Sequence, residues 1–380
     1  MTSHSQRARL HEVDETLDAI EECYRHGWTD GLPVVPPTLE RVEAMLETVS
    51  LPPGQILGEV PVRRRALTAE HAAANAVMAG CLPEYFPVVL AAMDAMFRHD
   101  PNCIHEASAA TNSPGILILV NGPIRKEIGL NCTGNLFSPG HRANATIGRA
   151  IRLILINVFE QRPNVLDRGC MGSLTKFGVC IGEDEERSPW EPFHVSRGFD
   201  ASQSTVTVAT VQDPEMLGNR YGTTAESLMD ATADAMSSHG LGIYLNDAPW
   251  FWVVGHWHAE MLGRQGWTRR RIQEYVYEKA WRSRAQLKRL GAANGVIVDG
   301  DEEARVPAAP SPEGVLVLKA GGDSGIYSEL LMNYHGLPAI TIPIRDSWED
   351  FRPPESEGDG DPDSLAPDAG TNATTEGRRK

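Results

Sequence analysis

The residue whose type and position most clearly suggest a chemical role is Cys132, which lies in the polar loop 131–135. This loop precedes a predicted helix whose first residues include His141 and Arg142. A thiol near a helix N-terminus can have a lowered pKa and act as a nucleophile or as a redox centre. His141 could then serve as its base, and Arg142 could hold an anion. The alternative interpretation is that Cys132 is an inert small residue of the loop.

The start of the same helix is expected to bind a small anion. Its first turn offers unpaired backbone N–H groups and the positive end of the helix dipole. Arg142 and Asn144 lie in this turn, and Asn121 ends the apolar strand that comes before the loop. We therefore predict that these three residues contact the substrate.

A second loop of interest is the glycine-rich stretch at 321–325, which follows a predicted strand. Such a turn can cradle a ligand, but it matches neither glycine pattern typical of nucleotide binding, and Asp323 would repel a phosphate. Asp323 and Ser324 are predicted either to contact substrate or to cap the next helix. The sequence specifies no cofactor.

A third feature is the pair of histidines at 256 and 258, directly after another apolar strand. An HxH pair suits a transition metal, although no third ligand is evident from the sequence. Alternatively, one histidine caps the following helix and the other is solvated. His258 is also a candidate for proton transfer, with Glu260 as its partner.

Alternating strands and helices are expected to position these residues. Ile116–Val120 is predicted to be a strand covered on both faces, because it is short, unbroken and aliphatic. Apolar residues at three- and four-residue spacing predict a helix that begins near Arg142. Further strands are predicted at 179–181, 204–211, 250–254, 315–318 and 339–344, and further helices at 83–97, 269–290 and 326–333.

This alternation predicts an α/β protein with a mostly parallel sheet flanked by helices, and ligands at the carboxyl ends of the strands. Two related lobes are an option, because Thr-Ala-Glu recurs at 68–70 and 224–226, each time opening a helix that precedes a buried strand. The predicted division has an N-terminal segment at 1–65, lobes at 66–215 and 216–350, and a disordered acidic tail at 351–380.

Composition narrows the classes of function. With 380 residues, 41% of them hydrophobic, the chain can form a sizeable core, and a net charge of −16 disfavours nucleic-acid binding. Six cysteines without CxxC pairing are typical of reduced thiols. The first residues lack the apolar stretch of a secretory signal, and no apolar run is long enough to span a bilayer. We expect a cytoplasmic protein without a membrane partner, and a homo-oligomer is an option.

Four stretches carry a resemblance to a known family: GWTDGLPVVPPT at 27–38, NAVMAGC at 75–81, RANATIGRA at 142–150 and AGG at 320–322. They resemble an uncharacterised bacterial family whose members are associated with small (seleno)proteins bearing a Gly-Ser-Cys motif, the UGSC-type proteins. The resemblance implies thiol or selenol redox chemistry with such a partner. It also places His258 in a family segment of the form Gly-Pro-Glu-His-Ala, where His256 is a departure; this favours His258 alone over a metal-binding pair.

These observations together predict an enzyme, an oxidoreductase or a lyase, that acts on a small anionic organic substrate. The reaction would be redox or C–S/C–N bond chemistry together with a thiol or selenol partner protein. Cys132 would be the nucleophile or redox thiol, and His141 or His258 would transfer protons. The alternatives are a metal-assisted hydrolase or lyase that uses His256 and His258, and a non-catalytic subunit that binds the thiol protein.

Overall fold

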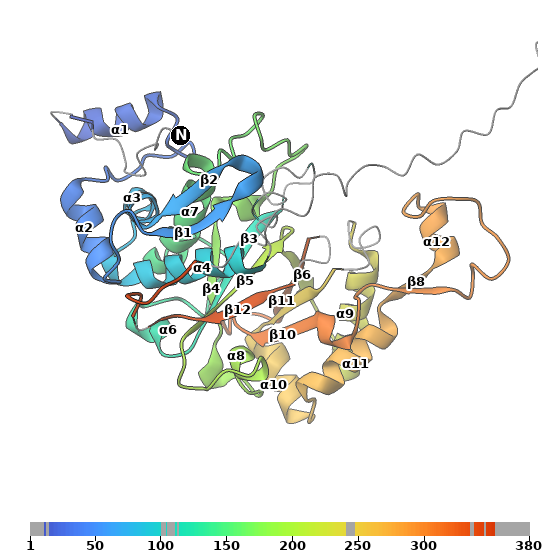
Figure 1. The fold of residues 1–380 in the computed structure, drawn as a ribbon. Coiled ribbons are helices and arrows are strands. Elements are labelled where there is room, and N and C mark those ends of the chain that lie inside the picture. The colour runs from blue at the N-terminus through green and yellow to red at the C-terminus, as the bar shows by residue number, and fades with distance from the viewer. Residues whose placement is uncertain are drawn as a thin grey trace, which may run out of the picture.

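A computed structural model describes residues 11–12, 15–99, 104, 111, 114–240, 248–334, 338–345 and 347–353. The fold is of the α/β kind, with two four-stranded mixed sheets at its centre and helices around them (Figure 1). The tail predicted to be disordered lies outside the described residues from residue 354 onward.

The first sheet contains the apolar strand that precedes the Cys132 loop. Its order is β12-β5-β3-β4, with bounds Ile340–Pro343, Thr205–Val211, Gly115–Asn121 and Val179–Gly182. Strand β3 pairs parallel with β4 and antiparallel with β5, and β12 joins β5 antiparallel. Every residue of β3 and β5 is buried, as expected for aliphatic and Thr-Val strands in the middle of a sheet.

The second sheet has the same pattern of pairings. Its order is β10-β7-β11-β6, with bounds Val315–Lys319, Trp250–Val254, Tyr327–Met332 and Glu215–Gly218. Strand β7 pairs parallel with β10 and antiparallel with β11, and β6 joins β11 antiparallel. In each sheet, therefore, the last strand comes from the other half of the chain: β6 follows β5 in sequence, and β12 follows β11.

The two sheets pack against each other. Side chains of a strand alternate between its two faces. Leu117 and Leu119 of β3 meet Phe251 and Val253 of β7 in one apolar core. The remaining strand residues point to the outer faces, where each sheet packs against helices in a core of its own. The layers are therefore helix, sheet, sheet and helix.

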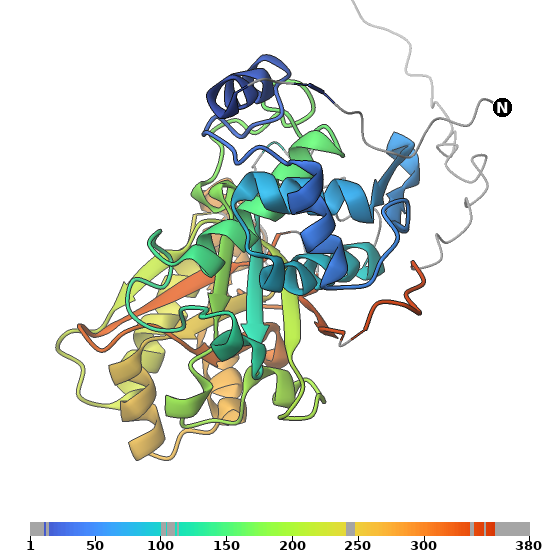
Figure 2. The ribbon, with the colours of Figure 1, turned by 90° about the vertical axis from the view of Figure 1, so that its left-hand side faces the viewer.

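The longer helices form the outer layers. The first sheet is covered by α3 (Ala69–Ala79), α4 (Phe86–His99) and α7 (Arg142–Asn157), and the second by α9 (Ala225–Ser238), α10 (His256–Arg264) and α11 (Arg269–Lys279). Figure 2 shows the blue and green helices above the strands and the yellow and orange helices below them.

Shorter elements complete the described chain. Strands β1 (Ile56–Val60) and β2 (Arg65–Thr68) form a hairpin, and β8 (Trp281–Ser283) pairs with β9 (Arg305–Pro307) in the extension at the right of Figure 1. The other helices are α1 (Thr16–Arg25), α2 (Leu39–Glu47), α6 (Ile124–Glu127), α8 (Phe193–Ser196) and α12 (Arg284–Arg289). The 3-10 helices are η1 (Pro61–Arg63), η2 (Pro83–Tyr85), η3 (Leu174–Phe177), η4 (Glu185–Arg187) and η5 (Pro312–Gly314).

Three predictions about the fold are wrong. The sheets are mixed rather than mostly parallel, because β5 and β11 run opposite to the strands beside them. Residues 327–332 form strand β11 instead of a helix, since this segment lies between two antiparallel partners that supply its backbone hydrogen bonds. The helix expected over 269–290 stops at Lys279, and β8 and α12 follow.

Candidate functional site

A cleft of about 660 Å³ opens where strands β7 and β10 of the second sheet end and β11 begins. Two loops form its walls, residues 133–138 after α6 and residues 320–325 after β10. Its floor includes Val253, Gly255 and the first residues of β11, and Arg187 and Met216 lie at its sides. The carboxyl ends of parallel strands are a common place for a ligand in an α/β fold.

Backbone contacts hold the two walls together. The Gly321 N–H donates to the Cys132 carbonyl oxygen at 2.9 Å. A Cβ atom on Gly322 would lie 2.8 Å from the Gly134 Cα atom, so a side chain at that position would push the loops apart. Gly321 itself has φ +97°, which is the left-handed region that favours glycine. Gly321 and Gly322 thus allow the 320–325 loop to lie in close contact with the loop that carries Cys132 and Gly134.

An ion pair beneath the cleft joins the two sheets. Lys319, at the end of β10, has a fully buried side chain that pairs with Asp184, and the Asp184 N–H donates to the Lys319 carbonyl oxygen at 2.8 Å. Burial lowers the pKa of Lys319, and Asp184 opposes that shift. Arg187 also pairs with Asp184 at 2.7 Å and keeps 39% of its side chain exposed at the cleft. Among the lining residues that the structure describes, Arg187 is the only arginine or lysine.

Among the titratable side chains that line the cleft, Glu329 has the pKa that differs most from its usual value. It lies on β11 opposite Val253 of β7 and Met216 of β6. Burial, and secondly the carboxylate of Glu215, raise the pKa of Glu329 to about 7. At neutral pH this carboxyl group is therefore present in both its acid and its base form, as proton transfer requires.

Next to it, Ser328 points to the opposite face of the strand, toward helix α10. Its Oγ atom accepts a hydrogen bond from the Gly255 N–H at 3.1 Å and lies 2.7 Å from His258 Nδ1. His258 is buried, and burial lowers its pKa to about 4, so the imidazole is neutral at pH 7. Its Nε2 atom has no hydrogen-bond partner in the described part of the chain. His258 therefore supports the floor of the cleft from behind, and it is not part of the lining.

Cys132 lies beside the cleft without lining it. Its Sγ atom is 3.5 Å from the Leu130 carbonyl oxygen and 3.7 Å from Arg125 Nη1, and it packs on Gly182. Burial raises the pKa of the Cys132 thiol, and Arg125 offsets only part of this shift. The helix terminus therefore does not produce the lowered pKa on which the prediction of a nucleophilic thiol rested.

The residues predicted to act at the start of α7 either hydrogen-bond to the backbone of the loop that carries Cys132 or are exposed to solvent. Asn144 is buried and exchanges hydrogen bonds with the backbone of Asn131, and it also donates to the Cys180 carbonyl oxygen. Arg142 is exposed and donates from Nε to the Gly80 carbonyl oxygen at 3.0 Å. His141 is exposed. None of the three belongs to the lining of the cleft, whereas the predicted Asp323 and Ser324 do.

Asn121 belongs to a separate, buried group of polar side chains at the end of β3. Its amide donates to the carboxylates of Glu183 and Glu185. Burial raises the pKa of Glu183 to about 7, and Arg125, which is 3% exposed, pairs with Glu185 at 2.7 Å. Asn121 therefore lies in this buried group and is not among the residues that line the cleft.

The geometry also disfavours a metal held by His256 and His258. Both residues lie in the first turn of α10, and side chains two positions apart in a helix project in different directions.

A scan of protein-family models and a search of curated proteins found no match for this chain. The resemblance to the family associated with UGSC-type proteins stays a prediction. No helix in the described part of the chain has the length and apolar character needed to cross a membrane.

Sequence reasoning missed Glu329 and Arg187. Glu329 stands in the segment Tyr-Ser-Glu-Leu-Leu-Met, which was predicted to be helical. If the segment is treated as a strand, Glu329 and Leu331 lie on the same face, because side chains alternate. Leu331 is buried between the two sheets, so Glu329 is the one acidic residue on that buried face. A single carboxyl group on the buried side of a strand is the signal that could have identified it.

Proposed function

We propose that this chain is an enzyme that binds a small anionic organic substrate in the cleft, and that Glu329 transfers the proton. The observation that carries the proposal is the raised pKa of Glu329, about 7, in the cleft at the strand ends of the second sheet. An altered pKa in a concave site is typical of catalytic groups, because proton transfer is most efficient when the pKa is near the working pH.

The lining suggests which substrate would fit. Arg187 can pair with a carboxylate group, while hydroxyl and amide groups of Thr133, Asn135 and Ser138 can orient polar substituents. Asp323 can accept from an amino or hydroxyl group on the far side. A small acid with one polar substituent complements this arrangement of charges.

Within the predicted reaction classes, a lyase acting on C–S or C–N bonds is better supported than a redox enzyme. No cysteine is among the described lining residues, but a proton-transfer group is. In such an elimination, the Glu329 carboxylate takes the proton from the carbon next to the substrate's carboxylate. The electron pair of that C–H bond becomes the new C=C bond, and the C–S or C–N bond breaks. Glu329, now protonated, gives this proton to the departing thiolate or amine and returns to its carboxylate form, so atoms and charges balance.

We also propose that the two halves of the chain are related. The support is the shared pairing pattern of the sheets and a glycine that directly follows both β3 and β7 and is closely approached by the backbone of another segment. A Cβ atom on Gly122 would lie 2.2 Å from the Gln203 carbonyl oxygen, and one on Gly255 would lie 1.9 Å from the Tyr327 carbonyl oxygen. Thr68 and Thr224, which open the repeated Thr-Ala-Glu segments, both cap their helices with the side-chain oxygen.

The proposed function is tested with a panel of small carboxylic acids that carry a thioether or amino group on the carbon β to the carboxylate, next to the carbon that loses its proton. Released thiol or amine and the unsaturated acid are measured together. We expect turnover with at least one member of the panel, with a dependence on pH centred near 7. Glu329→Gln should lower the rate at least about 100-fold, the usual range for loss of a general acid or base.

Glu59→Gln is the matched control, since Glu59 is a strand glutamate that is exposed and far from the cleft in the β1–β2 hairpin. If Glu329→Gln remains as active as this control while Cys132→Ser is inactive, the proposal is wrong and the thiol chemistry is favoured. If no panel member reacts, and turnover appears only with an added thiol protein and is unaffected by Glu329→Gln, a partner-binding role is favoured.

A further inference from the structure

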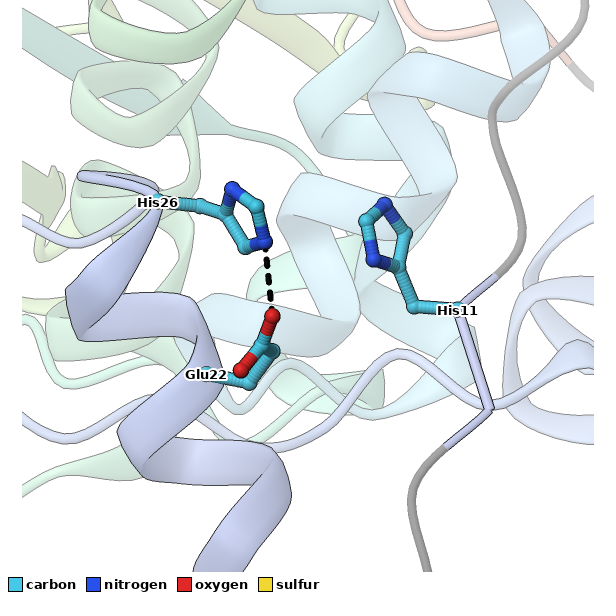
Figure 3. Close-up of side chains that lie close together, drawn as sticks. All are labelled: His11, Glu22 and His26. Atoms are coloured by element: carbon cyan, nitrogen blue, oxygen red, sulfur yellow. Dashed lines mark hydrogen bonds and ion pairs between the residues drawn. The ribbon is translucent and has the colours of Figure 1, made fainter.

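Two histidines and a glutamate come together at the N-terminal end of the described chain, away from the cleft. Glu22 and His26 are one helical turn apart on α1 and its C-terminal cap, and His11 comes from the segment before the helix. One potential ligand atom from each lies within 4.8 Å of the other two. Figure 3 shows Glu22 and His26 joined by a hydrogen bond, with the His11 ring facing them from the other side.

These residue types and this spacing are those of a transition-metal site. Residues four apart on a helix lie on the same face, so Glu22 and His26 can bind one ion together. Two imidazole nitrogens and one carboxylate oxygen are a common ligand set for Zn²⁺, with the fourth position left to water. Ligand atoms of a tetrahedral zinc site are about 3.4 Å apart at bond lengths of about 2.0–2.1 Å. Small side-chain rotations would bring these atoms together.

Neighbouring side chains orient the ligands. The His26 ring stacks on Trp28 at 4.5 Å with an interplanar angle of 16°, and the His11 ring meets both rings edge-on at 5.0 and 5.1 Å. The loop that carries Trp28 is itself fixed to α7. The Trp28 carbonyl oxygen accepts from Asn157, and Asp30 forms two 2.8 Å hydrogen bonds with Arg149.

We propose that His11, Glu22 and His26 form a binding site for one Zn²⁺ ion, in which the metal joins His11 to helix α1. Glu22 is shared between His26 at 2.7 Å and Arg25 at 2.7 Å. The ion takes the place of the hydrogen bond between Glu22 and His26 and adds His11. Arg25 keeps its contact with the second carboxylate oxygen.

The test uses the full chain, stripped of metal with a chelator, kept reduced and titrated with Zn²⁺ against a chromogenic chelator. We expect one ion per chain. His11→Ala and His26→Ala should each weaken binding at least about tenfold, in line with the loss of an important group at a metal site. His141→Ala is the matched control, since His141 is an exposed histidine outside the cluster, and it should bind zinc as the unchanged protein does.

Two further measurements distinguish zinc held at this site from zinc held by cysteines, and weakened binding from a loss of folding. Co²⁺ bound by two imidazoles and a carboxylate gives visible ligand-field bands without sulfur-to-metal charge transfer, so binding to cysteines is recognised by its near-ultraviolet absorption. Circular dichroism and thermal unfolding of each variant report whether it is folded. His11→Ala is informative even if His26→Ala disturbs the Trp28 stack, because His11 is exposed.

The proposal is overturned if the protein binds no stoichiometric zinc, if His11→Ala binds as tightly as the His141→Ala control, or if the cobalt spectrum shows sulfur ligands. These results are independent of the cleft and of any activity assigned to it.

Discussion

Replacement of Glu329 by glutamine should stabilise the protein at high pH and leave it nearly unchanged at low pH. The pKa of Glu329 is raised from an ordinary 4.5 to about 7 in the folded protein. Below about pH 4.5 the carboxyl group is protonated in both the folded and the unfolded chain, so it contributes nothing to the pH dependence. As the pH rises toward 7, the unfolded chain ionises while the folded chain resists, and this difference disfavours the folded state.

The size of the effect follows from linkage. A change in pKa from 4.5 to about 7 corresponds to an upper limit of about 3.4 kcal/mol in the free energy of unfolding. Because the side chain is only partly buried, solvent screening reduces the expected value to about 1–2 kcal/mol. Glutamine cannot ionise, so Glu329→Gln should remove this penalty above about pH 7 and show little gain near pH 4.5.

The assay is denaturant-induced unfolding of the wild type, Glu329→Gln and Glu59→Gln across this pH range. The measured quantity is the difference between each variant and the wild type. Other buried carboxyl groups with a raised pKa, such as Glu183, are present in all three proteins and cancel in this difference. The Glu59→Gln curve should be flat within about 0.5 kcal/mol, as for most exposed positions.

A second variant tests the physical cause. The Glu215 carboxylate contributes to the raised pKa, so Glu215→Gln should bring the pKa of Glu329 closer to its ordinary value. The reasoning is refuted if the Glu329→Gln difference is the same at every pH. That result would mean that Glu329 ionises normally, and the assignment of Glu329 as the proton-transfer group would lose its basis.

Three more predictions follow from contacts around the cleft. Gly322→Ala should lower both stability and ligand binding, because its Cβ atom would meet the opposite loop at 2.8 Å, whereas Gly54→Ala, with open space around it, should be nearly neutral; unfolding curves compare the two. Lys319→Ala should cost about 1–3 kcal/mol in the free energy of unfolding, since it removes one of the two cations paired with Asp184 and leaves Arg187 as the other, and chemical denaturation measures this. Cys132 should react with iodoacetamide more slowly than the exposed Cys170, because burial raises its pKa and limits access; peptide mass spectrometry ranks the two, and equal rates would contradict this.

The strands were predictable from sequence where burial is complete. The runs at 116–120, 250–254 and 315–318 are aliphatic or aromatic without a polar interruption, and each one is a strand with every residue buried. Burial of both faces leaves little choice of local structure for such short runs. The direction of the strands was not predictable, because parallel and antiparallel pairing depends on partners more than a hundred residues away, as between β5 and β12.

The site was harder to predict than the strands. The loop around Cys132 and the 321–325 loop were both chosen for their polar and glycine residues, and their backbones do meet. The sequence does not show how far each titratable side chain is removed from water in the folded protein, and this desolvation changes its pKa. Burial raises the pKa of Cys132 and lowers that of His258, and both changes run against the roles predicted for these residues. The same effect makes Glu329 a candidate, although it resembles any other glutamate in the sequence.

The proposed relation between the halves allows the corresponding ends of the two sheets to be compared. After β3 and after β7 a glycine follows the strand directly and the chain enters a helix, and the third residue beyond the glycine is polar in both cases, Arg125 and His258. In the first half, Arg125 pairs with Glu185 and Glu186, and these side chains close the end of the sheet.

In the second half, His258 is neutral and bound to Ser328, and the small residues of the 320–325 loop leave the strand ends open. Charged side chains that pair with one another therefore occupy the end of one sheet. Glycines at the equivalent end of the other sheet make room for a ligand.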